Sequence, residues 1–229
     1  MLLPLSLRRV IGYKSRMTQN LAALLPIVEA APVVPVLIIE DVKTAVPLAR
    51  ALVAGGLTAL EVTLRTPAAL ECIRAIKGEV EGANVGAGTI LDEKQFDAAV
   101  AAGSTFLVSP GATPRLLAHA DGSPVPLLPG IATASEAMAL LEAGYGAAKF
   151  FPAEQAGGAP YLKALSSPIP GLVFCPTGGV SLKNAPTYLS LPNVMCVGGS
   201  WVAPAAAVAA GDWAAITTLA AEAAALKAA

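Results

Sequence analysis

From residue 33 onward, short apolar runs alternate with longer segments in which apolar residues recur at helical spacing. Eight such runs predict strands, because each is rich in aliphatic residues and is bounded by proline, glycine or charge. They lie at residues 33–39, 57–64, 83–90, 106–109, 125–130, 147–152, 172–176 and 194–199. A strand that is apolar on both faces is typical of a parallel sheet covered by helices.

Helix-start signals follow these strands. Thr66-Pro67 and Thr113-Pro114 each join a capping residue to a proline that suits the first turn. Thr133 and Glu136 have capping-box spacing. The predicted helix starts at 44, 66, 92, 113 and 133 are 22, 26, 21 and 20 residues apart, the length of one strand–helix unit. Eight units predict one closed (β/α)8 barrel (a TIM barrel) rather than a doubly wound sheet, with an extra N-terminal helix at about 18–30 across one end.

The first sixteen residues differ from the remainder of the chain. They hold four basic residues and no acid, which gives +4 and leaves 11 − 16 = −5 for the remainder. Their apolar part precedes the arginines, the reverse of a secretory signal. A transit peptide is one alternative. We interpret residues 1–16 as a dispensable leader and 17–229 as the domain.

Composition excludes several classes of protein. Apolar residues make up 55% of the chain and charged residues 14%, which excludes disorder. The longest charge-free run, between Lys183 and Asp212, is broken by prolines and glycines, so it does not predict a membrane span. A net charge of −1 argues against a nucleic-acid partner. The three cysteines (Cys72, Cys175 and Cys196) form no CxxC motif, so we expect no disulfide framework and a cytoplasmic protein.

Polar residues stand near the ends of two predicted strands. Glu61, Thr63 and Arg65 have the same parity, so they face one way while their neighbours face the other. Lys149 and Phe151 likewise share a face of the sixth strand. In a (β/α)8 barrel, the C-terminal ends of the strands carry the catalytic groups.

Lys149 is the strongest candidate for catalysis. It stands in an apolar run where a charged amine is costly to bury, so the neutral amine is favoured there. A neutral amine can attack a ketone and form a Schiff base. The alternatives are a lysine paired with Glu61 or one that reaches the rim, and for Glu61 an ion pair with Arg65.

Glycine pairs follow the seventh and eighth strands, in PTGG (176–179) and VGGS (197–200). Backbone N–H groups in such loops can hold a phosphate, and these two loops form the usual phosphate site of the barrel. The single histidine, His119, supports neither a histidine-rich metal site nor a Ser-His-Asp triad. We therefore expect no metal and no cofactor.

Six motifs together resemble the class I family of 2-dehydro-3-deoxy-6-phosphogluconate (KDPG) aldolase and 4-hydroxy-2-oxoglutarate (KHG) aldolase. They are EVTLRT (61–66), GAGT (86–89), SPG (109–111), KFFPAE (149–154), CPTGG (175–179) and GGSW (198–201). The resemblance runs from about Val33 to Trp213. It implies a metal-free homotrimer that splits a small 2-keto acid phosphate to pyruvate and glyceraldehyde 3-phosphate in the Entner-Doudoroff pathway.

The same resemblance implies a role for each matching residue. Lys149 is the Schiff-base lysine and Glu61 the general acid and base, while Arg65 binds the carboxylate or phosphate end of the substrate. The residues that resemble the pyruvyl pocket are Thr89, Pro110 and Phe151. Those that resemble the phosphate and distal-hydroxyl end are Thr177, Gly178, Gly179, Gly199 and Ser200.

Three other functions stay open at this point. The aldolase for the galactonate epimer of the substrate differs only in the stereochemistry that it accepts at C4. A phosphosugar isomerase would use Glu61 as the base and Lys149 as an electrostatic helper, and a non-catalytic barrel would only bind a phosphorylated metabolite. Covalent trapping by borohydride with pyruvate separates an aldolase from the last two.

Overall fold

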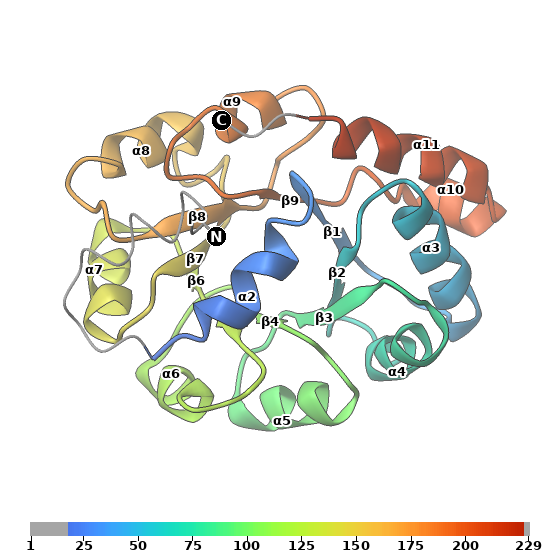
Figure 1. Cartoon of the computed structure of the whole chain (residues 1–229), viewed down its shortest axis with the longest axis horizontal. Helices are drawn as coiled ribbons and strands as arrows, with labels where there is room; N and C mark the ends of the chain where they lie inside the picture. The colour runs from blue at the N-terminus through green and yellow to red at the C-terminus, as the bar shows by residue number, and fades with distance from the viewer. Residues whose placement is uncertain (1–17, 227–229) are drawn as a thin grey trace.

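The computed structural model describes residues 18–226, so the predicted leader 1–16 lies outside the described residues. Strands and helices alternate along the chain, and the helices other than α2 lie outside the strands (Figure 1). The strands are β1 (Val33–Leu37), β2 (Ala59–Thr63), β3 (Asn84–Gly88), β4 (Leu107–Val108), β5 (Leu127–Leu128), β6 (Gly130–Ile131), β7 (Ala147–Phe150), β8 (Val173–Pro176) and β9 (Val197–Gly199). The helices are α2 (Leu21–Val28), α3 (Val42–Ala54), α4 (Ala69–Glu79), α5 (Glu93–Ala101), α6 (Pro114–Ala120), α7 (Ala134–Glu142), α8 (Gly158–Leu165), α9 (Ala185–Leu189), α10 (Ala205–Ala210) and α11 (Trp213–Ala224).

All strand pairs in the two sheets are parallel. One sheet has the order β5-β4-β3-β2-β1-β9 and the other the order β6-β7-β8. Single bridges, Phe174 to Val194 and Thr177 to Gly198, link β8 to β9 and the residues just before it. The chain thus has an α/β fold built on parallel strands. No helix of residues 18–226 is long and apolar enough to cross a membrane.

The prediction of one strand at 125–130 was wrong in detail. Pro129 separates β5 from β6, because proline has no N–H with which to continue a ladder. The carbonyl of Pro129 still accepts a hydrogen bond of 2.8 Å from the backbone N–H of Lys149. The break lets the chain leave the larger sheet and join the sheet that contains β7.

Helix capping followed the predicted pattern at two sites and departed from it at a third. The Thr133–Glu136 capping box is present, and Thr113 caps α6. The predicted start at Thr66 was wrong, because α4 begins at Ala69 without a side-chain cap. The Thr66 hydroxyl instead donates to the carbonyl of Ile39 at 2.6 Å, which ties the end of β2 to the end of β1.

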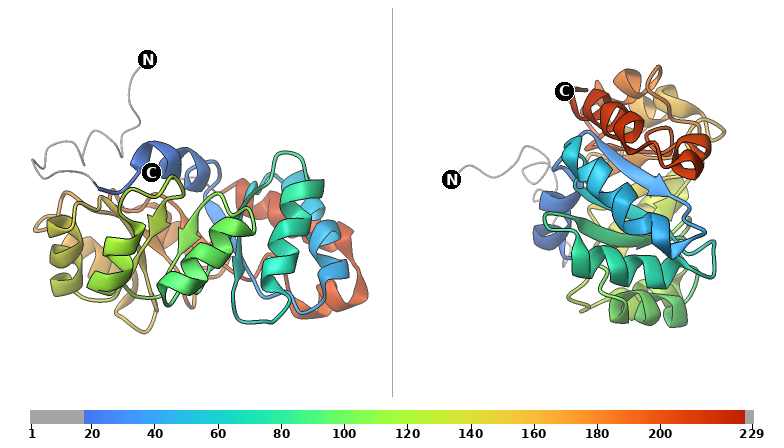
Figure 2. Two further views of the ribbon diagram at one scale, coloured as in Figure 1. Left: turned by 90° about the horizontal axis from the view of Figure 1, so that it is seen from below. Right: turned by 90° about the vertical axis from the view of Figure 1, so that its right-hand side faces the viewer.

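The interior faces of the strands enclose an apolar cluster that helix α2 covers at one end (Figures 1 and 2). Ala59 and Ala147 belong to this cluster, so the inward parity of β2 and β7 is fixed by their first residues. Gln19 holds the entry to α2, since its side-chain amide donates to the carbonyls of Leu127 and Ala147. The other members of the cluster are Leu21, Leu24, Leu25, Val28, Val34, Phe106, Val108, Leu128, Val173, Cys175, Met195 and Cys196.

Candidate active site

Lys149 and Glu61 meet inside the molecule. The Nζ atom of Lys149 lies 3.0 Å from the Oε1 atom of Glu61, although 88 residues separate the two in the chain. The residues are only 4% and 3% exposed. Each follows, by two positions on the same strand face, an alanine of the interior cluster. The pair therefore lies inside the strands, farther toward their C-terminal ends than those two alanines.

A glycine on the neighbouring strand provides the space for the carboxylate. Gly88 ends β3 beside β2, and a Cβ atom added there would lie 2.2 Å from Oε1 of Glu61. Gly86 has the same role deeper in the interior, where an added Cβ atom would lie 2.5 Å from the ring of Phe106. Both glycines of the GAGT motif are thus required sterically, because another side chain occupies the space beside each of them. The sequence alone does not show this.

The observed partner of Glu61 is Lys149 and not Arg65. A buried ion pair is a weak source of stability, because desolvation of the two charges offsets their attraction. It is, however, an arrangement in which one proton can pass between an amine and a carboxylate over 3.0 Å. The pair can present a neutral amine beside a carboxylic acid, or an ammonium beside a carboxylate.

Arg65 and Thr89 also come together, just beyond the ends of β2 and β3. The Nε atom of Arg65 donates to the Thr89 hydroxyl at 3.2 Å. Thr89 has a φ of 64°, the only positive value for a non-glycine residue within 18–226. A strained backbone is typical of residues that a function holds in place. The guanidinium and this hydroxyl lie at the exposed edge of the site.

Phe151 and Pro110 border the lysine. The Phe151 ring centroid lies 5.5 Å from Nζ, within the range of a cation–π contact. Gly130 pairs in register with Lys149, and a Cβ atom added at Gly130 would lie 2.3 Å from the carbonyl carbon of Pro110. Pro110 therefore lies directly against the residue that pairs with Lys149, a close approach that glycine permits.

The first glycine loop lies directly beside the lysine strand. The N–H of Thr177 donates to the carbonyl of Phe150 at 2.9 Å, and a Cβ atom added at Gly178 would lie 3.3 Å from the ring of Phe151. Gly178 and Gly179 have φ values of 103° and 77°, which favour glycine. Their own N–H groups donate to no other residue of the described chain.

The second glycine loop lies one strand farther on. Gly198 bridges to Thr177, while Gly199 packs so closely against the Trp201 ring that any Cβ atom there would overlap it. Ser200 is exposed and lines a groove of about 820 Å³ with Ile38 and its neighbours at the end of β1. The predicted site residues therefore gather at the C-terminal ends of β2, β3, β4, β7, β8 and β9.

Two cysteines are buried on β8 and just before β9. The neighbouring thiol of Cys175, together with burial, raises the pKa of the Cys196 thiol. Cys175 is the register partner of Lys149 on β8. Both are buried in the interior cluster, as expected of small core residues.

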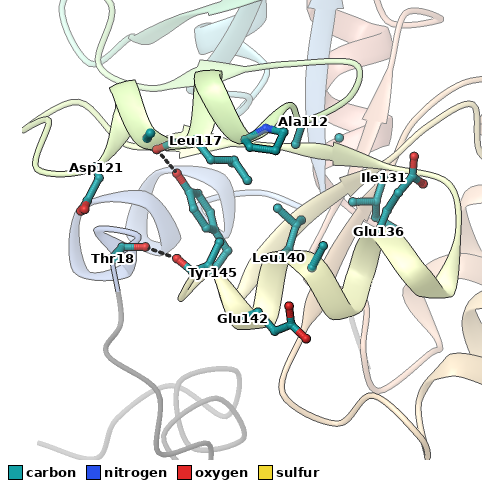
Figure 3. A pocket seen from close by; sticks show the side chains of 14 residues that line it. Thr18, Ala112, Leu117, Asp121, Ile131, Glu136, Leu140, Glu142 and Tyr145 are labelled. Atoms are coloured by element: carbon teal, nitrogen blue, oxygen red, sulfur yellow. Dashed lines mark hydrogen bonds between the residues drawn. The ribbon is translucent and has the colours of Figure 1, made fainter.

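The remaining candidates lie elsewhere. His119 stands on α6, and its Nε2 atom lies 2.7 Å from Asp97. Within residues 18–226, no three histidine, cysteine, aspartate or glutamate residues are grouped as metal ligands. A pocket of about 420 Å³ lies between α6 and α7, where Thr18, Leu117 and Tyr145 line it (Figure 3). It contains none of the predicted site residues.

Comparison with known proteins decides which family this geometry represents. The model of the aldolase family described as KDPG and KHG aldolase matches residues 25–219. The chain belongs to the KDPG and KHG aldolase family. This membership confirms the resemblance carried by the six motifs.

Curated members of the KDPG and KHG aldolase family are similar over most of their length. The 2-dehydro-3-deoxy-phosphogluconate aldolase of Pseudoalteromonas atlantica is 55% identical over 84% of this chain and 89% of its own. The KHG/KDPG aldolase of Escherichia coli K12 is 50% identical over 86% of this chain and 92% of its own.

Solved structures of the family agree with the fold. A KDPG aldolase of Zymomonas mobilis with 3-phosphoglycerate has a TM-score of 0.86 at 50% identity, covering 93% of this chain and 98% of its own. The Legionella pneumophila enzyme, with pyruvate captured as a covalent carbinolamine, has a TM-score of 0.85 at 46% identity, covering 87% and 97%. A native KDPGal structure is less similar, with a TM-score of 0.74 at 29% identity, covering 83% and 91%.

Proposed function

We propose that this protein is a class I aldolase that cleaves KDPG to pyruvate and glyceraldehyde 3-phosphate, and also KHG to pyruvate and glyoxylate. The observation that carries the proposal is the buried contact of 3.0 Å between Lys149 and Glu61. It joins an amine that can form an imine to a carboxylate that can move the protons of the reaction. The Legionella relative, whose structure holds pyruvate as a carbinolamine, supports the assignment.

The scaffold of the proposed enzyme is a closed (β/α)8 barrel with α2 as the extra helix across its N-terminal end. The support is the pairing of strands: β9 joins β1 in one sheet, the bridges from Phe174 and Thr177 join β8 to β9, and β5 runs into β6 across Pro129. This closure puts the strands that carry Lys149 and Glu61 on facing sides of one interior.

Lys149 performs the covalent step. Its proton passes to Glu61, and the neutral amine attacks the C2 ketone of the substrate to form a carbinolamine. Protonated Glu61 then gives its proton to the hydroxyl on C2, water leaves, and an iminium ion remains. The iminium accepts the electron pair that is released when the C3–C4 bond breaks, so no metal ion or cofactor is needed for this step.

Glu61 performs the proton transfers of bond cleavage. Its carboxylate removes the proton of the C4 hydroxyl as the C3–C4 bond breaks, which releases the aldehyde and leaves an enamine on Lys149. It then returns a proton to C3, and hydrolysis of the resulting iminium releases pyruvate. Gly88 keeps open the space that the carboxylate occupies during both transfers.

The two ends of the substrate are held at different edges of the site. Thr89, Pro110 and Phe151 form the pyruvyl pocket, and Arg65 contributes the positive charge for an anionic group. Its hydrogen bond to Thr89 fixes the guanidinium at this edge. The phosphate end is held at the two glycine loops, largely by backbone N–H groups. The residues that contribute there are Thr177, Gly178, Gly179, Gly199 and Ser200.

The substrate assignment is tested by comparing cleavage rates. Pyruvate release, followed by a coupled dehydrogenase, should be fastest with KDPG and slower with its galactonate epimer, since the KDPGal structure is the more distant relative. Ser200→Ala should raise KM for KDPG and leave KHG cleavage unchanged. Preference for the epimer would overturn the substrate assignment, and failure of pyruvate with borohydride to label the protein would favour the isomerase or the binding protein.

The proposed assembly is a cytoplasmic homotrimer. Ile38, Leu91 and Met138 are each more than half exposed, which is apolar surface that an interface would cover. The three cysteines are all buried and free, which suits a reducing compartment. Light scattering should give three times the mass of the chain, and a monomer mass would reject the trimer.

A further inference from the structure

Glu154, in the loop between β7 and α8, contacts the first glycine loop through both its backbone and its side chain. The carbonyls of Thr177 and Gly178 accept hydrogen bonds from the N–H groups of Ala153 and Glu154, at 2.8 Å and 3.1 Å. The Glu154 side chain packs against Gly179, where an added Cβ atom would lie 2.6 Å from its Cγ atom.

These contacts decide where the glycine N–H groups point. A trans peptide directs its C=O and its N–H to opposite sides. Because the carbonyls of Thr177 and Gly178 are held by residues 153 and 154, the N–H groups of Gly178 and Gly179 both point away from that loop. Two adjacent N–H groups on one side form an anion-binding concavity. The hydrogen bonds from Ala153 and Glu154 therefore fix the direction in which this concavity opens.

The loop between β7 and α8 is in turn held to the rest of the fold by the side chain of Glu154. The Glu154 carboxylate accepts a hydrogen bond from the hydroxyl of Tyr188, a fully buried residue of α9. Asn184, just before α9, donates from its amide to the carbonyl of Gly179 at 3.1 Å. Tyr188 on α9 thus holds Glu154, and Asn184 just before α9 holds the end of the glycine loop at Gly179.

We propose that the hydrogen bond between Glu154 and Tyr188 positions the Gly178–Gly179 loop and thereby sets the affinity for the phosphate end of the substrate. This inference rests on the proposed function. Glu154 is a positioning residue, because its carboxylate faces Tyr188 and the start of α8, behind the N–H groups that would meet the phosphate.

Tyr188→Phe removes the hydroxyl and keeps the ring that fills the core. Loss of a hydrogen bond to a charged group should raise KM for KDPG about tenfold while kcat changes little. KM for KHG, and the rate at which borohydride with pyruvate inactivates the enzyme, should stay at the wild-type values. Tyr161→Phe, which removes a hydroxyl from neighbouring α8, is the matched control and should change none of these.

A double-mutant cycle separates positioning from general loosening. Glu154→Ala should raise KM for KDPG. The double variant with Tyr188→Phe should have no higher a KM than Glu154→Ala alone, because the two substitutions remove the same hydrogen bond. Glu154→Gln, which keeps an acceptor for the tyrosine and the packing against Gly179, should restore most of the affinity.

Three results would overturn the inference: an unchanged KM for KDPG in Tyr188→Phe, equal losses for KDPG and KHG, or strict additivity in the cycle. Each of them requires a wild-type enzyme that pyruvate and borohydride inactivate and that cleaves KDPG. A wild-type protein that fails either of those assays would instead contradict the proposed function.

Discussion

A single methyl group added at Gly88 should disable the site without touching either reacting residue's chemistry. In Gly88→Ala, the new Cβ atom would stand 2.2 Å from Oε1 of Glu61, whereas an ordinary contact begins at 3.4 Å. The carboxylate must therefore move by about 3.4 − 2.2 = 1.2 Å. Because Glu61 is buried against Lys149, this movement disturbs the 3.0 Å contact on which both proton transfers depend.

The expected loss can be estimated from that displacement. A misplacement of roughly 1 Å costs about a hundredfold in rate, which corresponds to about 2.7 kcal/mol in the activation barrier. Overpacking of a buried strand also costs roughly 1–3 kcal/mol of folding stability, so the variant should stay folded but melt at a lower temperature. We expect kcat/KM for KDPG to fall about a hundredfold in the coupled pyruvate assay.

Gly111→Ala is the matched control for this prediction. Gly111 follows Pro110, and a Cβ atom added there would meet nothing within 4 Å. This variant should retain its kcat/KM and its melting temperature. If Gly88→Ala is folded and cleaves KDPG at close to the wild-type rate, the carboxylate of Glu61 does not need its observed position, and the reasoning fails.

The other predictions concern the base, metal independence and the leader. Glu61→Gln should keep pyruvate binding but lose about 10²–10⁴-fold in kcat, because a positioned acid and base is removed; near-normal cleavage would take Glu61 out of the proton transfers. Cleavage should survive EDTA, and activity that returns only with a divalent cation would point to the metal-dependent class of aldolases. A chain without residues 1–16 should keep full activity and the same oligomeric state by light scattering; a clear loss would make this segment a component of the working enzyme.

Strand parity carried much of the site prediction. It grouped Glu61 with Thr63 on one face of the second strand, because a two-residue period needs no knowledge of distant contacts. That this face points inward is seen only in the structure, where Ala59 lies in the interior cluster. Parity did not decide between Arg65 and Lys149 as the partner of Glu61, since that choice depends on which strands face each other across the interior. The role of Gly88 was also out of reach, because the space it leaves is defined by a side chain on another strand.

Other elements were missed where local signals were absent or used differently. Helix α8 begins at Gly158 with Gly157 as its N-cap, both residues have positive φ, and no side chain caps the helix, so the sequence carries no start signal there. Thr66 has the features of a cap, but its hydroxyl binds the end of β1 instead. Glu154 follows β7 and Tyr188 follows β8, and no sequence pattern predicts the hydrogen bond between them.

The most direct test of the account is to identify the residue that forms the imine. Incubation with pyruvate and borohydride should inactivate the protein, and peptide mass mapping should place one reduced pyruvyl adduct on Lys149. Lys149→Arg keeps the charge but should be neither labelled nor active, because a guanidinium does not form the imine; Lys163→Arg, on the surface of α8, should behave as the wild type. An adduct on any other lysine, or full activity in Lys149→Arg, would contradict the central claim.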